Sequence, residues 1–457
     1  MDQDPVAAKP ASPAPGEDDA AVEAVLGPAG EERSARQVRF SFGGLLVTQL
    51  LGAFNDNVLK QFILLQLALG GLWHDYLGSP TVGIVSVAYT LPFILFSGYA
   101  GQFADQQSKR WVAVLLKTVE IPIVCIAGVG IHYHQFWTTF AALILLSTHS
   151  AFFGPAKYGM IPEILPERRL PRGNGSINMT TNMAIIMGVV FGGFASDYLR
   201  GDPLAQPPVA PEPNLCFYIL LLAAIAGRIT VMFVQKLDAR DPKLRIHPSP
   251  FHTYRHALGE IWRAPNLRRA AFGWSFFYFV AACAMLSIPE LKQYLMLDGA
   301  HPSDTQISYI NAALGIAIGV GSLAAGLLSR GQISIRAVWA GGIGLTAGLL
   351  VFPFLPRESY AWAMTVLCVL GFWAGFYLVP LMSYIQATAP AKERGQFLGT
   401  VNFLSMVAFA AGSGVYAAMR YKLEPHWALL LCGVLFIVVL DLMRDMKLTP
   451  ATAKAQA

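Results

Sequence analysis

Long runs of apolar residues dominate this chain, and short polar segments separate them. A helix that crosses a membrane needs about 20 apolar residues, and twelve runs come close to or exceed that length. The runs lie at residues 40–69, 81–104, 111–131, 135–153, 174–198, 215–235, 270–291, 306–328, 336–355, 361–385, 396–419 and 427–443. The pattern predicts an all-α polytopic membrane protein with twelve transmembrane helices in two six-helix halves.

The polar segments divide the chain into five regions. Residues 1–38 are rich in Ala, Pro, Glu and Asp and are expected to form a disordered cytoplasmic tail. The two six-helix halves should span residues 39–236 and 270–446, and a cytoplasmic central loop at 237–269 should join them. A second cytoplasmic tail is expected at 447–457.

The central loop contains a periodic apolar pattern of its own. Phe251, Tyr254, Leu258, Ile261 and Trp262 recur at intervals of mostly three to four residues among basic side chains. This spacing predicts an amphipathic helix that lies on the membrane surface. A soluble linker helix is the alternative interpretation.

The composition agrees with a membrane protein, because 54% of the residues are hydrophobic and only 13% are charged. Soluble domains carry roughly 25% charged residues. The formal net charge of +5 comes from basic residues in the gaps between apolar runs and not from one patch. We therefore expect no nucleic-acid partner.

Lys and Arg residues are distributed unequally between the two sides of the predicted membrane protein. With the N-terminus placed inside, 25 of them fall on the cytoplasmic side and five on the other, while three lie within spans. Cytoplasmic loops carry the excess of basic residues in membrane proteins. Both termini are therefore expected in the cytoplasm.

Several charged and amide side chains lie within the predicted spans, where they are costly unless they face a wet cavity or one another. We expect them to line a central substrate cavity, and they are Asn55, Asp56, Asn57, Lys60, Lys117, Glu120, Asn178 and Arg228. Asp56 and Lys60 are four residues apart, so they share a helix face and can pair. A purely structural ion pair between helices is the alternative. His149, in the fourth run, is expected to be a buried histidine and not a proton relay.

The segment after the second run combines a glycine, a carboxylate and a basic pair, at Gly101, Asp105, Lys109 and Arg110. Glycine allows a tight helix end, and the aspartate can cap a neighbouring helix N-terminus or pair with an arginine. Such a network can act as a conformational latch, whereas a simple charged turn is the alternative. The spacing resembles the signature loop of the major facilitator superfamily. The equivalent loop of the second half lacks the aspartate, so the latch should be asymmetric.

The two halves resemble each other in sequence. Pro155 is followed by Gly175 and Asn178 at spacings of 20 and 3, and the second half repeats the pattern from Pro380 at spacings of 19 and 3. This similarity favours two parallel repeats around a midplane site.

Three glycine pairs have the GxxxG spacing, which permits close helix contact. We expect them to mark packing inside the bundle and not a dimer face, and the chain to be a monomer. The pairs are Gly188 with Gly192, Gly315 with Gly319, and Gly371 with Gly375.

Two motifs are similar to those of the bacterial lysophospholipid transporters, a branch of the same superfamily. One spans residues 53–60, and the other spans 153–159 and continues to Glu163 and residues 173–175. The resemblance implies a multi-pass protein of the bacterial inner membrane that moves lysophospholipids from the outer to the inner leaflet by alternating access. A separate acyltransferase would then restore the diacyl lipid.

A lysophospholipid head group carries a phosphate and often an ammonium. The resemblance then implies that Lys60, Lys117 and Arg228 meet the phosphate and that Asp56 or Glu120 meets the ammonium. Lys157, in the second motif, joins the substrate-binding candidates.

Two other functions compete with lysophospholipid transport. A proton-coupled exporter of amphipathic drugs would use Asp56 or Glu120 as its proton carrier. A membrane-embedded enzyme would need a metal cluster, a nucleophile elbow or a phosphate-cradling loop, and the sequence contains none of these patterns. We therefore expect no enzymatic activity and no cofactor.

The charge distribution makes a prediction about topology. A cysteine introduced at Asp4 should stay unlabelled by a membrane-impermeant thiol reagent in intact cells and become labelled after the cells are permeabilised. Labelling in intact cells would contradict a cytoplasmic N-terminus.

Overall fold

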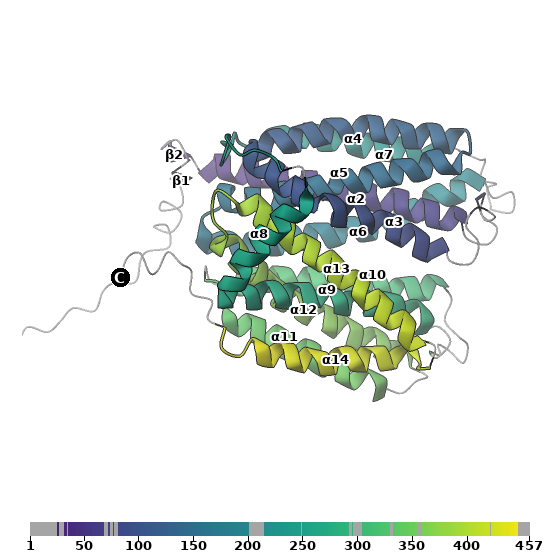
Figure 1. The fold of residues 1–457 in the computed structure, drawn as a ribbon. Coiled ribbons are helices and arrows are strands. Elements are labelled where there is room, and N and C mark those ends of the chain that lie inside the picture. Colours follow the sequence, from purple (N-terminus) through teal and green to yellow (C-terminus); the bar gives the residue numbers. More distant parts are fainter. Residues whose placement is uncertain are drawn as a thin grey trace, which may run out of the picture.

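The computed structural model contains thirteen α-helices in its described part (Figure 1). The described residues are 25–26, 32–33, 35–67, 72–73, 76, 81–200, 214–247, 249–291, 295, 304–329, 332–354, 359–420 and 422–446. Most of the predicted tail at 1–38 and all of the tail at 447–457 lie outside the described residues.

The helices follow the predicted runs in order. They are α2 (Ala35–Leu67), α3 (Thr81–Gln106), α4 (Lys109–His132), α5 (Phe136–Ile164), α6 (Leu170–Arg200), α7 (Leu215–Thr230), α8 (Pro250–Arg263), α9 (Pro265–Glu290), α10 (Asp304–Leu328), α11 (Ile335–Val351), α12 (Tyr360–Thr388), α13 (Arg394–Arg420) and α14 (Pro425–Leu442). The shorter elements are the 3-10 helices η1 (Glu167–Arg169), η2 (Val231–Phe233) and η4 (Phe352–Phe354), and the paired strands β1 (Val25–Leu26) and β2 (Glu32–Arg33).

Some helices extend beyond the predicted runs. Helix α5 continues through Pro155 and Pro162, because neighbouring helices can satisfy the backbone groups that proline frees in a membrane helix. The predicted run ended at residue 153 and so placed Lys157 in the following loop. In the structure Lys157 lies on α5. Helix α9 begins at Pro265, inside the predicted central loop, and α2 begins at Ala35, inside the predicted tail.

Nine helices of the described part are long and apolar enough to cross a membrane, by length and composition alone. Helix α14 is apolar but shorter, while α2 and α3 are not among the nine. The multi-pass character is thus confirmed, and the count of twelve spans stays a prediction.

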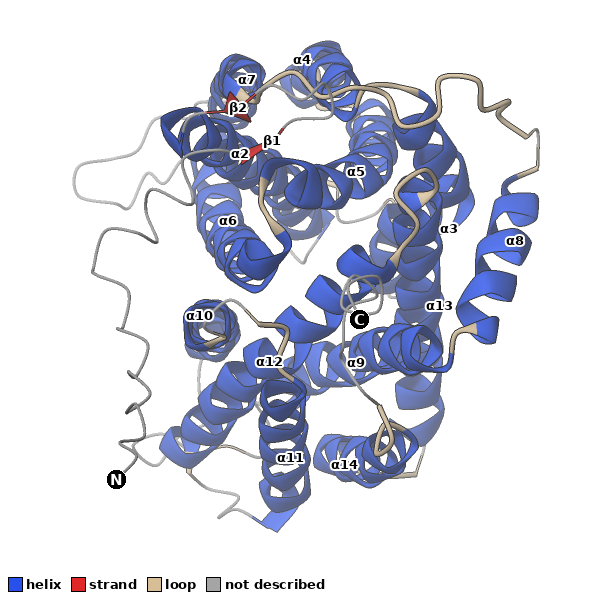
Figure 2. Ribbon diagram, turned by 90° about the vertical axis from the view of Figure 1, so that its left-hand side faces the viewer, coloured by secondary structure: helices blue, strands red, loops and turns tan. Residues whose placement is uncertain are grey.

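The helices form two bundles, α2–α7 and α9–α14 (Figure 1). Viewed along the helices, α4 and α7 lie at one outer edge and α11 and α14 at the other (Figure 2). The bundles meet mainly where α6 packs against α10 and α3 against α13. Helices α3, α5 and α6 contact the other half, and α2 packs against α5 and α6; we call these four helices the inner wall of the N-terminal half.

One end of the bundle is defined by α8, and we call it the α8 side. There α3, α5 and α7 end and α9 and α13 begin (Figures 1 and 2). Helix α8 buries Tyr254, Ala257 and Ile261 and leaves Phe251 and Trp262 65% and 69% exposed. The predicted amphipathic helix is confirmed, and its position on the membrane surface stays a prediction.

The GxxxG glycines all face another helix of the same chain. An added Cβ would meet α2 at Gly188 and Gly192, and α6 at Gly315 and Gly319. The remaining pair, at positions 371 and 375, packs against α10. The prediction that these pairs serve packing inside the bundle is confirmed.

Gly375 gives a test of this packing. Gly375→Ala would drive a methyl group into the backbone of α10 at Ser322 and should cost about 1–3 kcal/mol of stability. Gly154→Ala is the matched control, because nothing lies within 4 Å of its added Cβ and alanine favours a helix. Thermal unfolding of the purified proteins should show a lower Tm for the first variant only. Equal Tm values would contradict the packing.

Candidate functional site

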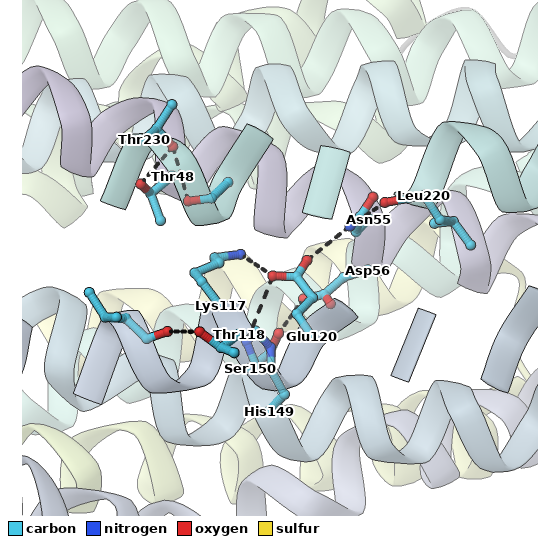
Figure 3. Close-up of polar contacts among 12 residues, drawn as sticks. Thr48, Asn55, Asp56, Lys117, Thr118, Glu120, His149, Ser150, Leu220 and Thr230 are labelled. Atoms are coloured by element: carbon cyan, nitrogen blue, oxygen red, sulfur yellow. Dashed lines mark hydrogen bonds and ion pairs between the residues drawn. The ribbon is translucent and has the colours of Figure 1, made fainter. Parts of the chain in front are cut away.

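A cluster of buried polar side chains lies inside the N-terminal half, between α2, α4, α5 and α7 (Figure 3). The Lys117 ammonium contacts Oε2 of Glu120 at 2.5 Å, and Asn55 Nδ2 donates to Oε1 of the same carboxylate at 2.9 Å. Asn55 also donates to the Leu220 carbonyl oxygen at 3.1 Å. His149 Nε2 lies 3.8 Å from Glu120 Oε2.

This cluster is closed to solvent. Lys117, Glu120 and Asn55 are each 0% exposed, and His149 is buried as predicted. Within the cluster the lysine and carboxylate charges compensate each other, and the amide satisfies the second carboxylate oxygen. Lys117 and Glu120 both lie on α4, and it is Glu120 that links this helix to Asn55 of α2 and His149 of α5.

Asp56 follows Asn55 on α2 but points toward α5. There the Ser150 hydroxyl donates to Asp56 Oδ2 at 2.6 Å (Figure 3). The Lys60 ammonium, one turn further along α2, lies 5.1 Å from the centre of the Tyr89 ring on α3. Among the described ion pairs none joins Asp56 to Lys60, so the pair predicted from their spacing is not formed. The described close contacts of the two side chains are instead with Ser150 of α5 and Tyr89 of α3.

Lys157 is the second cation on the inner wall. It is 9% exposed, and its ammonium lies 4.4 Å from the centre of the Tyr158 ring. In the described part of the chain neither Lys157 nor Lys60 forms an ion pair within 4.0 Å. Asp56 acts electrostatically on both lysines. The inner wall of the N-terminal half thus carries two cations and one carboxylate, which favours an anionic group.

Three sequence candidates lie apart from these charges. Arg228 Nε donates to the Thr118 hydroxyl at 2.8 Å on the exposed outer face of α4 and α7, so the structure does not place it on the inner wall. Asn57 Nδ2 donates to the Ala53 carbonyl oxygen of its own helix at 2.7 Å. Asn178 is half-buried on α6 and has no described contact with the charged group.

The Asp105 carboxylate joins the two halves on the α8 side. Its two oxygens accept from the backbone N–H groups of Gly395 and Gln396 at 2.7 and 2.9 Å. These residues open α13, so the carboxylate caps the N-terminus of a helix of the other half. This is one of the two contacts expected for Asp105. Gly101, one turn earlier, approaches the backbone of Gly395 so closely that a Cβ would not fit.

The basic pair of the latch, Lys109 and Arg110, contacts the N-terminal half and not the C-terminal half in the described part of the chain. The Lys109 ammonium lies 2.8 Å from Glu163 Oε1, which also accepts from Arg240 Nε at 2.9 Å. Arg110 donates to the Met232 carbonyl oxygen at 3.3 Å. Glu163 therefore ties α5 both to Lys109 of α4 and to Arg240 of the segment that follows η2, and Arg110 ties α4 to η2.

Further contacts between the halves involve residues that the sequence did not single out as site residues. Asn174 of α6 donates to Ser383 Oγ at 3.1 Å and to Gln386 Oε1 at 2.7 Å, both on α12. Asn402 of α13 donates to Ser97 Oγ of α3 at 2.9 Å. Asn174 lies in the second motif and Asn402 in the internal repeat, and these two patterns were the available signals. Ser97 and Ser383 had none.

All described hydrogen bonds between α2–α7 and α9–α14 lie in the α8-side half of the helices. The two halves are therefore joined by polar contacts on this side. This arrangement corresponds to a conformation closed on the α8 side.

Comparison with known proteins agrees with this architecture. A Major Facilitator Superfamily model matches residues 39–413. The chain is 25% identical to the lysophospholipid transporter LplT of Klebsiella pneumoniae subsp. pneumoniae over 380 residues, which cover 82% of this chain and 87% of the relative.

Solved structures show the same fold. The human organic anion transporter MFSD10 superposes with a TM-score of 0.71 at 15% identity, covering 89% of this chain and 99% of that one. FucP in its outward conformation gives a TM-score of 0.71 at 13% identity, with coverages of 91% and 100%. The predicted fold is thereby confirmed, and the chain belongs to the Major Facilitator Superfamily.

Proposed function

We propose that this protein moves lysophospholipids from the outer to the inner leaflet of a bacterial cytoplasmic membrane by alternating access. The observation that carries the proposal is the pair of lysines without ion-pair partners, Lys60 and Lys157, beside Asp56 on the inner wall. The name of the Klebsiella relative and the two sequence motifs support the substrate class. Delivery to a separate acyltransferase would follow on the inner leaflet.

The positions of the two lysines fit successive contacts with one phosphate. Helices α2 and α5 are antiparallel, and Asp56 contacts Ser150 between them. Lys60 lies one turn from Asp56 toward the end opposite α8, whereas Lys157 lies seven residues from Ser150, about 10 Å along α5, toward the α8 side. A phosphate that enters from the end opposite α8 would meet Lys60 first and Lys157 later. An ammonium on the same head group would be left for Asp56.

The orientation of the protein in the membrane is inferred from the charge distribution. The excess of Lys and Arg lies at the α8 side, which would therefore face the cytoplasm. The conformation closed on that side is then open toward the outer leaflet. Release into the inner leaflet requires the hydrogen bonds at Asp105, Asn174 and Asn402 to break.

Proton-coupled export of an amphipathic solute is the second candidate function. It is favoured by Asp56, a buried carboxylate whose described hydrogen bond comes from a neutral hydroxyl. Glu120 is a poorer proton carrier than expected, because Lys117 holds it as an ion pair. An ionophore that collapses the proton gradient should abolish export, whereas it should leave gradient-independent lipid movement intact.

Transport by the purified protein tests the proposal. In liposomes, labelled lysophosphatidylethanolamine and lysophosphatidylglycerol should reach the inner leaflet faster than in protein-free vesicles. Lys60→Gln and Lys157→Gln should each slow both lipids by roughly ten- to a hundredfold, because a charge-assisted hydrogen bond contributes about 1.5–3 kcal/mol. Lys243→Gln, at an exposed loop position, is the matched control. Absence of movement above protein-free vesicles would overturn the lysophospholipid assignment.

Head-group dependence tests the role of Asp56. Asp56→Asn should slow the ethanolamine lipid more than the glycerol lipid, because only the former carries an ammonium. Equal losses for both lipids would return Asp56 to a structural role in which it only holds Ser150.

The contact of Asp105 with α13 predicts the effect of neutralising it. Asp105→Asn keeps one acceptor oxygen but loses the charge at the helix N-terminus, a loss of about 0.5–2 kcal/mol. The α8-side-closed state should become less populated and transport should slow, while expression and Tm change little. Transport at the wild-type rate would refute the latch.

A further inference from the structure

Helix α8 contacts both halves of the transporter through one side chain, Tyr254. Its ring stacks on Phe403 of α13, with centroids 4.1 Å apart and planes 15° from parallel. Its hydroxyl donates to the Ile94 carbonyl oxygen of α3 at 3.0 Å and accepts from the Gly98 N–H at 2.7 Å. One residue of the central segment thus holds α3 and α13 together.

The hydroxyl binds α3 at an unusual place. In an uninterrupted α-helix the N–H of residue 98 donates to the carbonyl oxygen of residue 94. The Tyr254 hydroxyl forms hydrogen bonds with both of these groups and so bridges the N–H and the carbonyl oxygen of one turn of α3. An inserted hydrogen-bonding group of this kind bends a helix. Gly98, which has no side chain, leaves its N–H open to the approach.

The same stretch of α3 is weakened by a second feature. Pro92 lies inside the helix, and it cannot donate to the carbonyl oxygen of Ala88. The turn that lacks this hydrogen bond is thus next to the turn that Tyr254 contacts. Ser97, inside the bridged turn, and Asp105, further along α3, make the contacts with α13. The bridged turn is therefore placed to set the direction of the α3 segment that closes the α8 side.

Tyr254 is well suited to a reversible contact. It is only 2% exposed, and burial raises the pKa of its hydroxyl to about 12. The hydroxyl therefore keeps its proton at physiological pH and can donate to Ile94. Its two hydrogen bonds are neutral, so water can replace them when the helices separate.

We propose that Tyr254 is a positioning residue of the transport cycle, which stabilises the α8-side-closed state by bridging a turn of α3 while its ring rests on α13. Opening of the α8 side would then separate Tyr254 from α3 or from α13. Helix α8 is thereby coupled to the conformational change and is more than a connection between the halves. The inference rests on the alternating-access part of the proposed function and not on its substrate.

Distance measurements between spin labels test this directly. In a full-length chain whose five cysteines are replaced, labels at Gln107 and Lys392 report the α8 side, and labels at Trp137 and Trp362 report the opposite side. Tyr254→Phe keeps the ring but removes both hydrogen bonds. It should raise the open-to-closed ratio on the α8 side by roughly tenfold, with a matching closure at the opposite side.

Two further variants serve as a parallel test and a control. Phe403→Leu removes the stacking partner and should shift the ratio in the same direction with the hydroxyl intact. Tyr218→Phe, on a ring that is 51% exposed on α7, should leave both distance distributions unchanged. Tyr254→Phe distributions identical to those of Tyr218→Phe would overturn the proposal. A lower Tm with unchanged distances would do so too, because it would assign Tyr254 a structural role only.

This readout needs no substrate. A shift in the distances without lipid transport would leave the Tyr254 proposal standing and would remove only the lysophospholipid assignment. Transport of lysophospholipid together with unshifted distances would support the lysophospholipid assignment and overturn the Tyr254 proposal.

Discussion

Hydrocarbon offers no hydrogen bonds, so polar groups within the spans need partners inside the protein or a wet cavity. Most of the N-terminal half obeys this constraint by internal pairing. Lys117 and Glu120 neutralise each other, and Asn55 satisfies the remaining carboxylate oxygen. Lys60 and Lys157 are different, because aromatic rings are their described contacts. A cation in that position needs water or an anionic ligand, and this need connects the packing of the bundle to its function.

The same constraint explains which features the sequence could predict. The apolar runs and the polar gaps located the helices, because length and hydropathy are local properties. The face of each helix was harder to assign, since lipid is as apolar as the protein core. Lys117 and Arg228 therefore looked equivalent in sequence, yet one is sealed inside the half and the other lies on its outer face. The spacing of Asp56 and Lys60 gave a shared face but could not show that Asp56 accepts from Ser150 and that Lys60 lies over the Tyr89 ring.

Helix α8 shows the contrasting case. One of its faces meets the protein and the other does not, so its apolar periodicity predicted both the helix and its buried side chains. The periodicity could not show that the Tyr254 hydroxyl reaches Ile94, which lies 160 residues earlier in the chain. The contact of Asp105 with α13 was easier to predict from sequence. A carboxylate at the end of a helix has few favourable partners, and the N-terminus of another helix is one of them.

The kinds of contact within and between the halves determine which parts can move together. The ion pair of Lys117 and Glu120 lies inside one half, and separating its charges in a dry interior would cost several kcal/mol. The α6–α12 and α3–α13 contacts between the halves at Asn174 and Asn402 are neutral hydrogen bonds, and each contributes only about 0.5–1.5 kcal/mol because water can replace it. These bonds lie at the α8 side, where water can enter once the helices part. The hydrogen bonds of the seam, together with the Asp105 cap on α13, can thus exchange with water when the halves part, while the buried charges of the N-terminal half stay paired, which favours rigid-body rocking.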